Sequence, residues 1–358
     1  MKFISRICFV SIVAIGFVFT ACEKTAEDSK VGETRTYYDF NDVDYSDATG
    51  RLNLLVSLTE EIRKTNTEGV SIEAQTLIDF YKSDTDGVVD LEDLFYEVQS
   101  NPVALFDQFA DLEDLSKNFS TENTGSTGAG IVVSGEESYL FDANGIELGE
   151  LIRQRLLGGI VYYSAINFYT SDNFMVATLS QVEPDRSDEI AVMEEAIDNA
   201  FGYFGAPVDF PLNDEGLLFY ASESHKFDPV AESDQDIMNA YIKIRAGITE
   251  ADMNTRNAGI FELRVAFERV LISSMLHSLN QMKSSYSDRA LRNHHWSVVY
   301  GNMTNLSQNP GNSIVPSQSD SIYNYLRDNP DMIALTDIDT AQMVLARAYN
   351  LTAIKDDF

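Results

Sequence analysis

The sequence predicts a mainly α-helical fold, a multi-helix bundle with little β-structure. Apolar residues recur every three or four positions along most of the chain, as on one face of a helix, and alternating strand-like patterns are scarce. A composition with 44% apolar residues, including 21 Phe and 17 Tyr, supplies a large core. We expect one helical domain at 37–358, which a polar segment could divide into halves at 37–120 and 136–358.

The first helices are expected to follow an acidic, aromatic lead-in at 37–50, whose rings dock onto the body. The first helix begins at Arg51, with four apolar residues on one face: Leu52, Leu55, Leu58 and Ile62. Pro102 stops or starts a helix, because proline does not fit a helix interior. Further helices are expected at 71–82, 90–99 and 103–117.

The middle of the chain combines a flexible segment with a buried helix. Residues 120–135 are polar and rich in glycine, which predicts a surface loop or a boundary, and a short strand or turn follows at 135–144. Residues 146–169 are apolar almost all round, which is typical of a central, buried helix. Gly158 and Gly159 would let a neighbouring backbone approach it closely.

The C-terminal part is expected to consist of amphipathic helices and one long loop. The helix at 188–204 should end at Gly205 and Pro207, with its last aromatic rings packed inward. The loop, rich in Pro, Gly, Ser and Asn, is expected at 309–321. The other helices are expected at 236–249, 258–283, 289–306, 322–328 and 340–351.

The start of the chain has the layout of a lipoprotein signal. Lys2 and Arg6 precede an apolar run that is shorter than the roughly 20 residues needed to span a bilayer. The run ends in F-T-A-C, with small residues before Cys22. We predict that residues 1–21 are a signal peptide, that Cys22 carries a lipid, and that 22–36 form a flexible tether.

The tether indicates an outer-membrane location. Glu23, rather than aspartate, follows the lipidated cysteine, which fits transport to the outer membrane. The acidic segment at 23–28 resembles signals that export lipoproteins to the cell surface. We therefore predict a lipid-anchored outer-membrane protein whose body lies in the periplasm or at the cell surface.

The chain is strongly acidic and lacks usable thiols. Cleavage before Cys22 would remove two of its 25 basic side chains and none of its 57 acidic ones, taking the formal charge from −32 to −34. This charge keeps the protein soluble or attracts cations and basic partners, and it excludes nucleic acid as a partner. Cys8 lies in the predicted signal peptide, so no disulfide, thiol nucleophile or Cys-ligated metal is expected. No cofactor is predicted.

One acidic segment resembles a calcium-binding loop. With Gly87 at the sixth position, carboxylates fall at the third, fifth, ninth and twelfth positions: Asp84, Asp86, Asp90 and Asp93. Lys82 stands at the first position and cannot be a ligand. We favour an acidic helix–turn–helix connector in which Asp90 caps the next helix. The alternative is a weak cation site formed by these four carboxylates.

The histidines and a group of acids are the other candidate site residues. His225, His277, His294 and His295 lie in no recognised metal motif. His277 is expected in the core, and at most one of the adjacent His294 and His295 should face it, because neighbours on a helix point about 100° apart. No G-x-S-x-G motif is present. We interpret three acidic residues as part of a solvated helix face: Glu194, Glu195 and Asp198.

Five segments carry a family resemblance: YDF at 38–40, VDYS at 43–46, RLN at 51–53, YLFDANGIEL at 139–148 and AFGYFGAP at 200–207. In this order they resemble a family of uncharacterised Gram-negative lipoproteins, classed as a domain of unknown function. In its location at the outer membrane, that family is similar to imelysin-like helical lipoproteins. This similarity implies an association with iron acquisition. The imelysin G-x-H-x-x-E signature is absent, and 294–298 reads HHWSV where relatives have H-A-L-S-E. We therefore assign no metal-binding role to residues of this chain from the resemblance.

These observations favour a non-enzymatic outer-membrane or surface lipoprotein that binds a ligand or partner, as an accessory to iron or haem uptake. Its expected partners are the membrane, through the lipid, and an outer-membrane receptor protein. One alternative is an adhesion or interaction module for a protein or glycan. A second is a hydrolase with an unrecognised site, which would bring a histidine, an acid and a serine together.

Overall fold

The computed structural model describes residues 35–82, 91 and 103–358. Residues Val31–Phe358 form one compact unit. The predicted lipid site at Cys22 lies outside the described residues. So do the predicted helix at 90–99, apart from Leu91, and the four carboxylates of the candidate cation site: Asp84, Asp86, Asp90 and Asp93.

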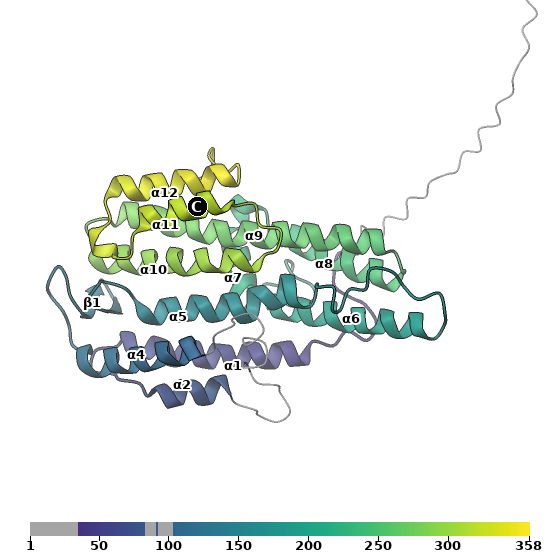
Figure 1. The fold of residues 1–358 in the computed structure, drawn as a ribbon, viewed down its shortest axis with the longest axis horizontal. Helices are drawn as coiled ribbons and strands as arrows, with labels where there is room; N and C mark the ends of the chain where they lie inside the picture. The colour runs from purple at the N-terminus through teal and green to yellow at the C-terminus, as the bar shows by residue number, and fades with distance from the viewer. Residues whose placement is uncertain (1–34, 83–90, 92–102) are drawn as a thin grey trace, which may run out of the picture. The chain divides into compact units, whose positions relative to one another are not determined.

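The prediction of a mainly α-helical fold is confirmed (Figure 1). The α-helices are α1 Ser46–Arg63, α2 Ala74–Tyr81, α4 Val103–Phe119, α5 Leu148–Leu156, α6 Asp185–Phe204, α7 Phe219–Ala231, α8 Asp234–Thr249, α9 Met253–Ser284, α10 Arg289–Asn305, α11 Pro316–Leu326 and α12 Leu335–Ala348. A hairpin of β1 Gly130–Ser134 and β2 Glu137–Phe141 pairs antiparallel, with Gly130 opposite Phe141. No helix among the described residues combines the length and the apolar character needed to cross a membrane.

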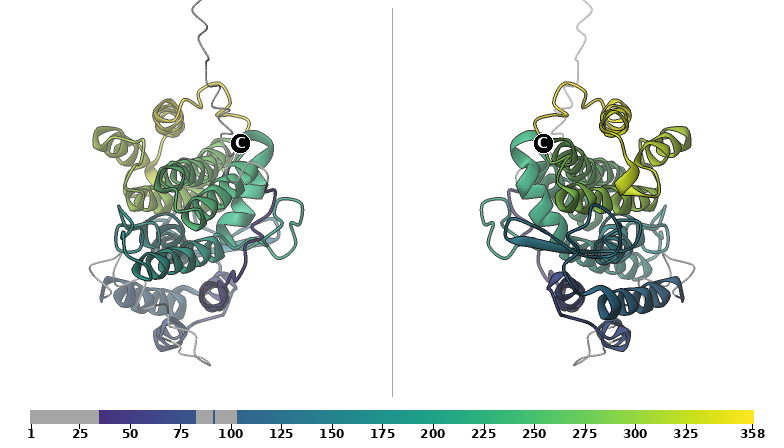
Figure 2. Two further views of the ribbon diagram at one scale, coloured as in Figure 1. Left: turned by 90° about the vertical axis from the view of Figure 1, so that its right-hand side faces the viewer. Right: turned by 90° about the vertical axis from the view of Figure 1, so that its left-hand side faces the viewer.

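The helices form layers around α5 (Figures 1 and 2). α1, α2 and α4 lie on one side of α5, and α9, α10, α11 and α12 lie on the other. α5 contacts both α1 and α10. One apolar core runs through all layers, from Leu52 in α1 to Leu345 in α12. The segments before and after the glycine-rich region therefore share a core.

The predicted buried helix at 146–169 forms the centre of the bundle. It begins as α5 and continues as two π-helical stretches, η2 Leu157–Tyr162 and η3 Ser164–Phe168. A Cβ at Gly158 would lie 1.8 Å from Asn305 Oδ1, and Asn305 Nδ2 donates to the carbonyl oxygen of Gln154 at 3.0 Å. Because the Asn305 side chain binds a carbonyl oxygen of this helix, the local hydrogen-bonding pattern is disturbed. This accounts for the wider, π-helical turns. Gly158 thus allows a close approach, but the group that approaches is the side chain of Asn305 and not the predicted backbone.

The lead-in before α1 docks as expected. Tyr38 is fully buried, and its ring stacks on Phe201 of α6 with centroids 4.2 Å apart. The predicted end of α6 is also confirmed, since Phe201, Tyr203 and Phe204 are buried and Gly205 closes the helix at φ +83°.

Three parts of the predicted element order are wrong. α7 was not predicted, because Ser224 interrupts its apolar stripe and Pro229 lies within it. α11 begins at Pro316, inside the segment expected as a loop, since proline suits the first turn of a helix. The expected flexible segment at 120–135 contains β1.

Candidate functional site

A cavity of about 350 Å³ opens among α1, α5, α7, α9 and α10. Three of the chain's four histidines line it: His277, His294 and His295. We call it the histidine cavity. Its volume lies near the lower end of the range for small-molecule sites, which favours a small ligand.

The wall of the histidine cavity carries more basic than acidic side chains, although acidic residues outnumber basic ones by 57 to 25 in the chain. The basic residues are Arg63, Arg153 and Lys226, and the acidic residues are Glu60 and Glu223. Within the described part of the chain, only Arg153 of these five has an ion-pair partner within 4.0 Å. The other four charges line the cavity without such a pair among the described residues, although the charge of Glu223 also acts on Arg153.

Arg153 is held in one orientation by Glu150, one turn earlier on α5. Arg153 Nε donates to Glu150 Oε2 at 2.8 Å, and Nη2 donates to Oε1 at 2.6 Å. Burial opposes ionisation of Glu150, but the guanidinium outweighs it and holds the pKa of Glu150 well below its usual range. Nη1 of Arg153 donates to no acceptor among the described residues. A fixed guanidinium in the cavity wall thus keeps an unused donor.

His294 pairs with Glu147, the residue before α5. Its Nδ1 donates to Glu147 Oε2 at 2.6 Å, and Asn66 Nδ2 donates to the other carboxylate oxygen at 2.8 Å. Burial lowers the pKa of His294, but the carboxylate of Glu147, supported by that of Glu150, outweighs burial and raises the pKa above its usual value. The two carboxylates therefore stabilise the imidazolium form relative to that of a solvent-exposed histidine.

Glu147, Glu150 and His294 are the residues in the described ranges that could together hold a metal ion, since one ligand atom from each lies within 4.8 Å of the others. A divalent cation would compete with Arg153 for Glu150 and with the proton on His294. Glu150 is already paired with the guanidinium of Arg153, and Glu147 with the imidazole of His294. The residues fit an ion-pair network better than a metal centre.

The pKa values of His277 and His295 are shifted in the opposite direction to that of His294. Burial, aided by the neighbouring His294, lowers the pKa of His295 to about 3, and burial also lowers the pKa of His277. Both imidazoles are neutral near pH 7, with ring centroids 6.2 Å apart. Nδ1 of His295 is buried without a hydrogen-bond partner in the described structure. The predicted core position of His277 is wrong, because the side chain is half-buried in the cavity wall.

A family model described as Domain of unknown function (DUF4856) matches residues 40–345. The chain belongs to the DUF4856 family. The prediction of a family of unknown function is therefore confirmed. No curated protein and no solved structure matches the chain. Every residue named above in the wall of the histidine cavity lies within the DUF4856 range.

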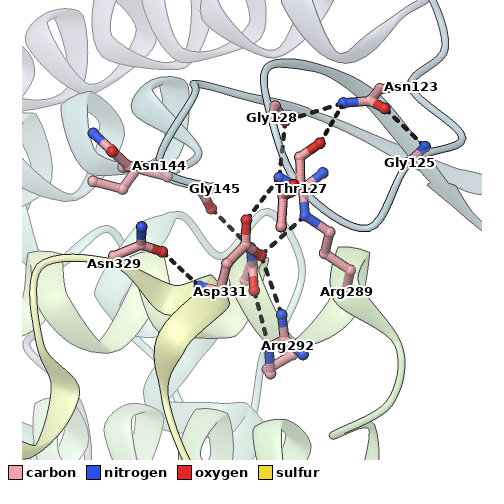
Figure 3. A network of polar contacts seen from close by, with 12 residues as sticks. Asn123, Gly125, Thr127, Gly128, Asn144, Gly145, Arg289, Arg292, Asn329 and Asp331 are labelled. Carbon is pink, nitrogen blue, oxygen red and sulfur yellow. Dashed lines mark hydrogen bonds and ion pairs between the residues drawn. The ribbon is translucent and has the colours of Figure 1, made fainter.

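A polar network in the DUF4856 domain fixes the turn that leads into Glu147 (Figure 3). Asp331 accepts hydrogen bonds from two arginines of α10 and from Asn293 Nδ2, the last at 2.8 Å. The same Nδ2 donates to the carbonyl oxygen of Gly145 at 3.0 Å. Gly145 has φ +82°, and a Cβ there would lie 2.6 Å from Asn293 Nδ2. α10 thus positions both members of the Glu147–His294 pair, because it carries His294 and also holds the turn before Glu147.

The DUF4856 domain does bring a histidine, an acid and a serine together, at the junction of α7 and α8. His225 Nδ1 lies 2.8 Å from Asp234 Oδ2, but Ser224 Oγ donates to Asp234 Oδ1 at 2.6 Å rather than to the histidine. Ser224 is also fully buried. A serine nucleophile needs a hydroxyl that is bonded to the base and reachable by substrate, so this cluster joins two helices.

The acidic face predicted on α6 is only partly exposed. Glu195 is exposed, but Asp198 is 2% exposed and accepts hydrogen bonds from Tyr38 Oη at 2.7 Å and Arg245 Nε at 3.1 Å. Glu194 pairs with the same arginine. The interpretation of Asp198 as a solvated residue is therefore wrong.

Sequence reasoning missed Glu147, Glu150 and Arg153. They lie within a segment that was correctly predicted to be buried on all sides. Charged side chains are almost never buried unless they are paired. The four charged residues of this largely apolar segment, Arg155 included, were therefore the available signal for a functional or structural cluster.

Proposed function

We propose that the protein is a non-enzymatic, lipid-anchored binding protein of the outer membrane that holds a small ligand in the histidine cavity. The observation that supports this most directly is a set of charges that line a cavity of ligand size and have no ion-pair partner within the described ranges: Arg63, Lys226, Glu60 and Glu223. Unpaired charges that converge on one cavity are typical of a binding site, because a ligand supplies the missing partners.

Binding is favoured over catalysis by the contacts of the histidines. His225 and His294 are each paired with a buried carboxylate, and neither pair includes a serine hydroxyl bonded to the imidazole. His295 has a strongly lowered pKa, which makes it a weak base. We therefore favour ligand binding over hydrolysis as the function of the protein.

Iron or haem is a second candidate ligand. The neutral imidazoles of His277 and His295 favour it, since neutral imidazole is a good ligand for iron. The paired cluster of Glu147, Glu150 and His294 does not add to this support, because a bare ion would have to displace Arg153. The family resemblance to iron-associated lipoproteins is the other support.

Mass spectrometry tests the binding function. We expect the full-length protein, extracted from its native membranes with mild detergent, to release one small molecule per chain on denaturation. Metal analysis and the visible spectrum of the same sample decide between iron or haem and a metal-free ligand. A sample that carries no small molecule, and that no fraction of a cell extract stabilises against heat, would contradict the proposal.

The anchor is tested by Cys22→Ser. Without the thiol no lipid can be attached, so we expect the variant to leave the outer-membrane fraction and the wild type to remain there. Loss of labelling by a radioactive fatty acid is the second readout. Cys8→Ser is the matched control, because Cys8 lies in the predicted signal peptide. Unchanged fractionation and labelling of the Cys22 variant would rule out the anchor.

A further inference from the structure

The guanidinium of Arg153 is arranged as a receptor for an anionic group. Two of its nitrogens are fixed by Glu150, at 2.8 and 2.6 Å, and Gln154 Nε2 binds the same carboxylate at 2.7 Å. The side chain is 18% exposed, so the guanidinium is neither freely mobile nor fully hydrated. An oxyanion that met Nη1 would form a charge-assisted hydrogen bond without any rearrangement of Arg153.

Two further cations line the same cavity from other helices. Arg63 is the last residue of α1, and Lys226 lies on α7. Both are exposed, and in the described structure neither is ion-paired. In a chain with a formal charge of −32, acidic partners are abundant, so two unpaired cations at one cavity are unexpected. They would draw an anion to the opening and toward Arg153.

The remaining polar groups suit the uncharged part of a ligand. His277 and His295 are neutral, and a neutral imidazole offers one donor and one acceptor. Glu60 and Glu223 can accept from further donors of the ligand. The volume of about 350 Å³ limits its size.

We propose that the histidine cavity takes a small organic anion, a carboxylate or a phosphate ester, whose charged group binds Arg153 and is attracted by Lys226 and Arg63. This inference rests on the proposed binding function and names the chemical class of its ligand. Carboxylate and phosphate share the chemistry that a guanidinium recognises, so the experiment has one arm for each.

Calorimetric titration of the detergent-solubilised, ligand-stripped full-length protein tests the proposal. The probes are succinate, citrate, inorganic phosphate and the uncharged diamide succinamide. We expect at least one of the carboxylates or phosphate to bind and succinamide not to bind. The affinity should fall as salt is raised, because charged contacts at an open cavity are screened.

Variants locate the binding group. Arg153→Gln combined with Glu150→Gln removes both members of the buried pair, so no unpaired charge is left, and should weaken anion binding about 10-fold or more. Lys226→Gln alters an exposed residue and should weaken binding a few-fold without affecting the fold. Lys243→Gln is the control, since Lys243 pairs with Glu262 on the surface and does not line the cavity.

The outcomes separate the two proposals. Binding of succinamide as tightly as succinate, or anion binding that the Arg153 and Lys226 variants leave unchanged, would overturn the anion assignment. Release of an uncharged molecule or a bare metal from the native protein would also overturn it while leaving the binding function intact. Anion binding that is lost in the Arg153 double variant and kept in Lys243→Gln would support the assignment.

Discussion

Arg245→Met should lower the free energy of unfolding by about 3–5 kcal/mol, because it breaks a buried ion pair on one side. Arg245 is 4% exposed, and Asp198, its partner at 3.1 Å, is 2% exposed. Met keeps the unbranched stem of the side chain but not the charge. Asp198 would then retain one strong donor, the hydroxyl of Tyr38 at 2.7 Å.

The expected loss follows from the position of Asp198. Burial already raises the pKa of this carboxyl, more than its contacts with Tyr38 and Arg245 lower it. Without the guanidinium, Asp198 must either stay charged in the core or take up a proton, and both cost free energy. The segment that includes Tyr38 should therefore loosen from α6 as well.

Urea denaturation followed by circular dichroism measures the effect. Lys243→Gln is a matched control on the same helix, because Lys243 forms an exposed pair with Glu262 at 2.7 Å and should change stability by about 0–1 kcal/mol. An Arg245→Met variant that unfolds at the same urea concentration as the control would show that the network does not stabilise the protein.

The sequence predicted the helices whose apolar stripes are uninterrupted. α6 ends where glycine and proline indicate, and the apolar segment that contains Ile160 lies at the centre of the bundle. α7 escaped prediction because a buried serine and an internal proline break its pattern. The spacing of apolar residues identifies a helix only where apolar residues occupy its whole buried face.

The histidine cavity could not be predicted from the sequence, for a different reason. Its wall combines residues from five helices, and Arg63 and His294 are separated by more than half the chain. No local spacing connects such residues. The position of His277 was misjudged because a helical stripe shows which side faces inward, but not whether a cavity lies there. Asp198 was misjudged because the sequence does not show that Arg245 lies opposite it.

Close helix contacts were also only partly predictable, and they lead to the second large effect. Gly158 stood out because it interrupts an apolar helix, but Gly247 gave no such signal. It lies near the end of α8, where the chain turns back into α9. A Cβ at Gly247 would lie 2.6 Å from the backbone nitrogen of Arg256 and 3.1 Å from the carbonyl oxygen of Asp252.

Gly247→Val should therefore destabilise the protein by about 3 kcal/mol, near the upper end of the usual cost of overpacking. The atoms in the way belong to the backbone, so no side-chain rotation can relieve the collision. α8 and α9 would have to separate, and a second glycine makes the contact similarly tight about one helical turn further from the α8–α9 connection. A Cβ at Gly259 would lie 2.7 Å from Ile244 Cγ1 and 3.1 Å from its backbone nitrogen.

Thermal unfolding of Gly247→Val beside Gly311→Ala gives a clear comparison. The nearest atom to a Cβ at Gly311 is 3.9 Å away, so this control should unfold within about 0.5 kcal/mol of the wild type. Because α9 supplies His277 to the histidine cavity, separation of α8 from α9 should also weaken any ligand bound there. Equal stability of the two variants would mean that the helices can part at little cost and that the close α8–α9 contact is not required.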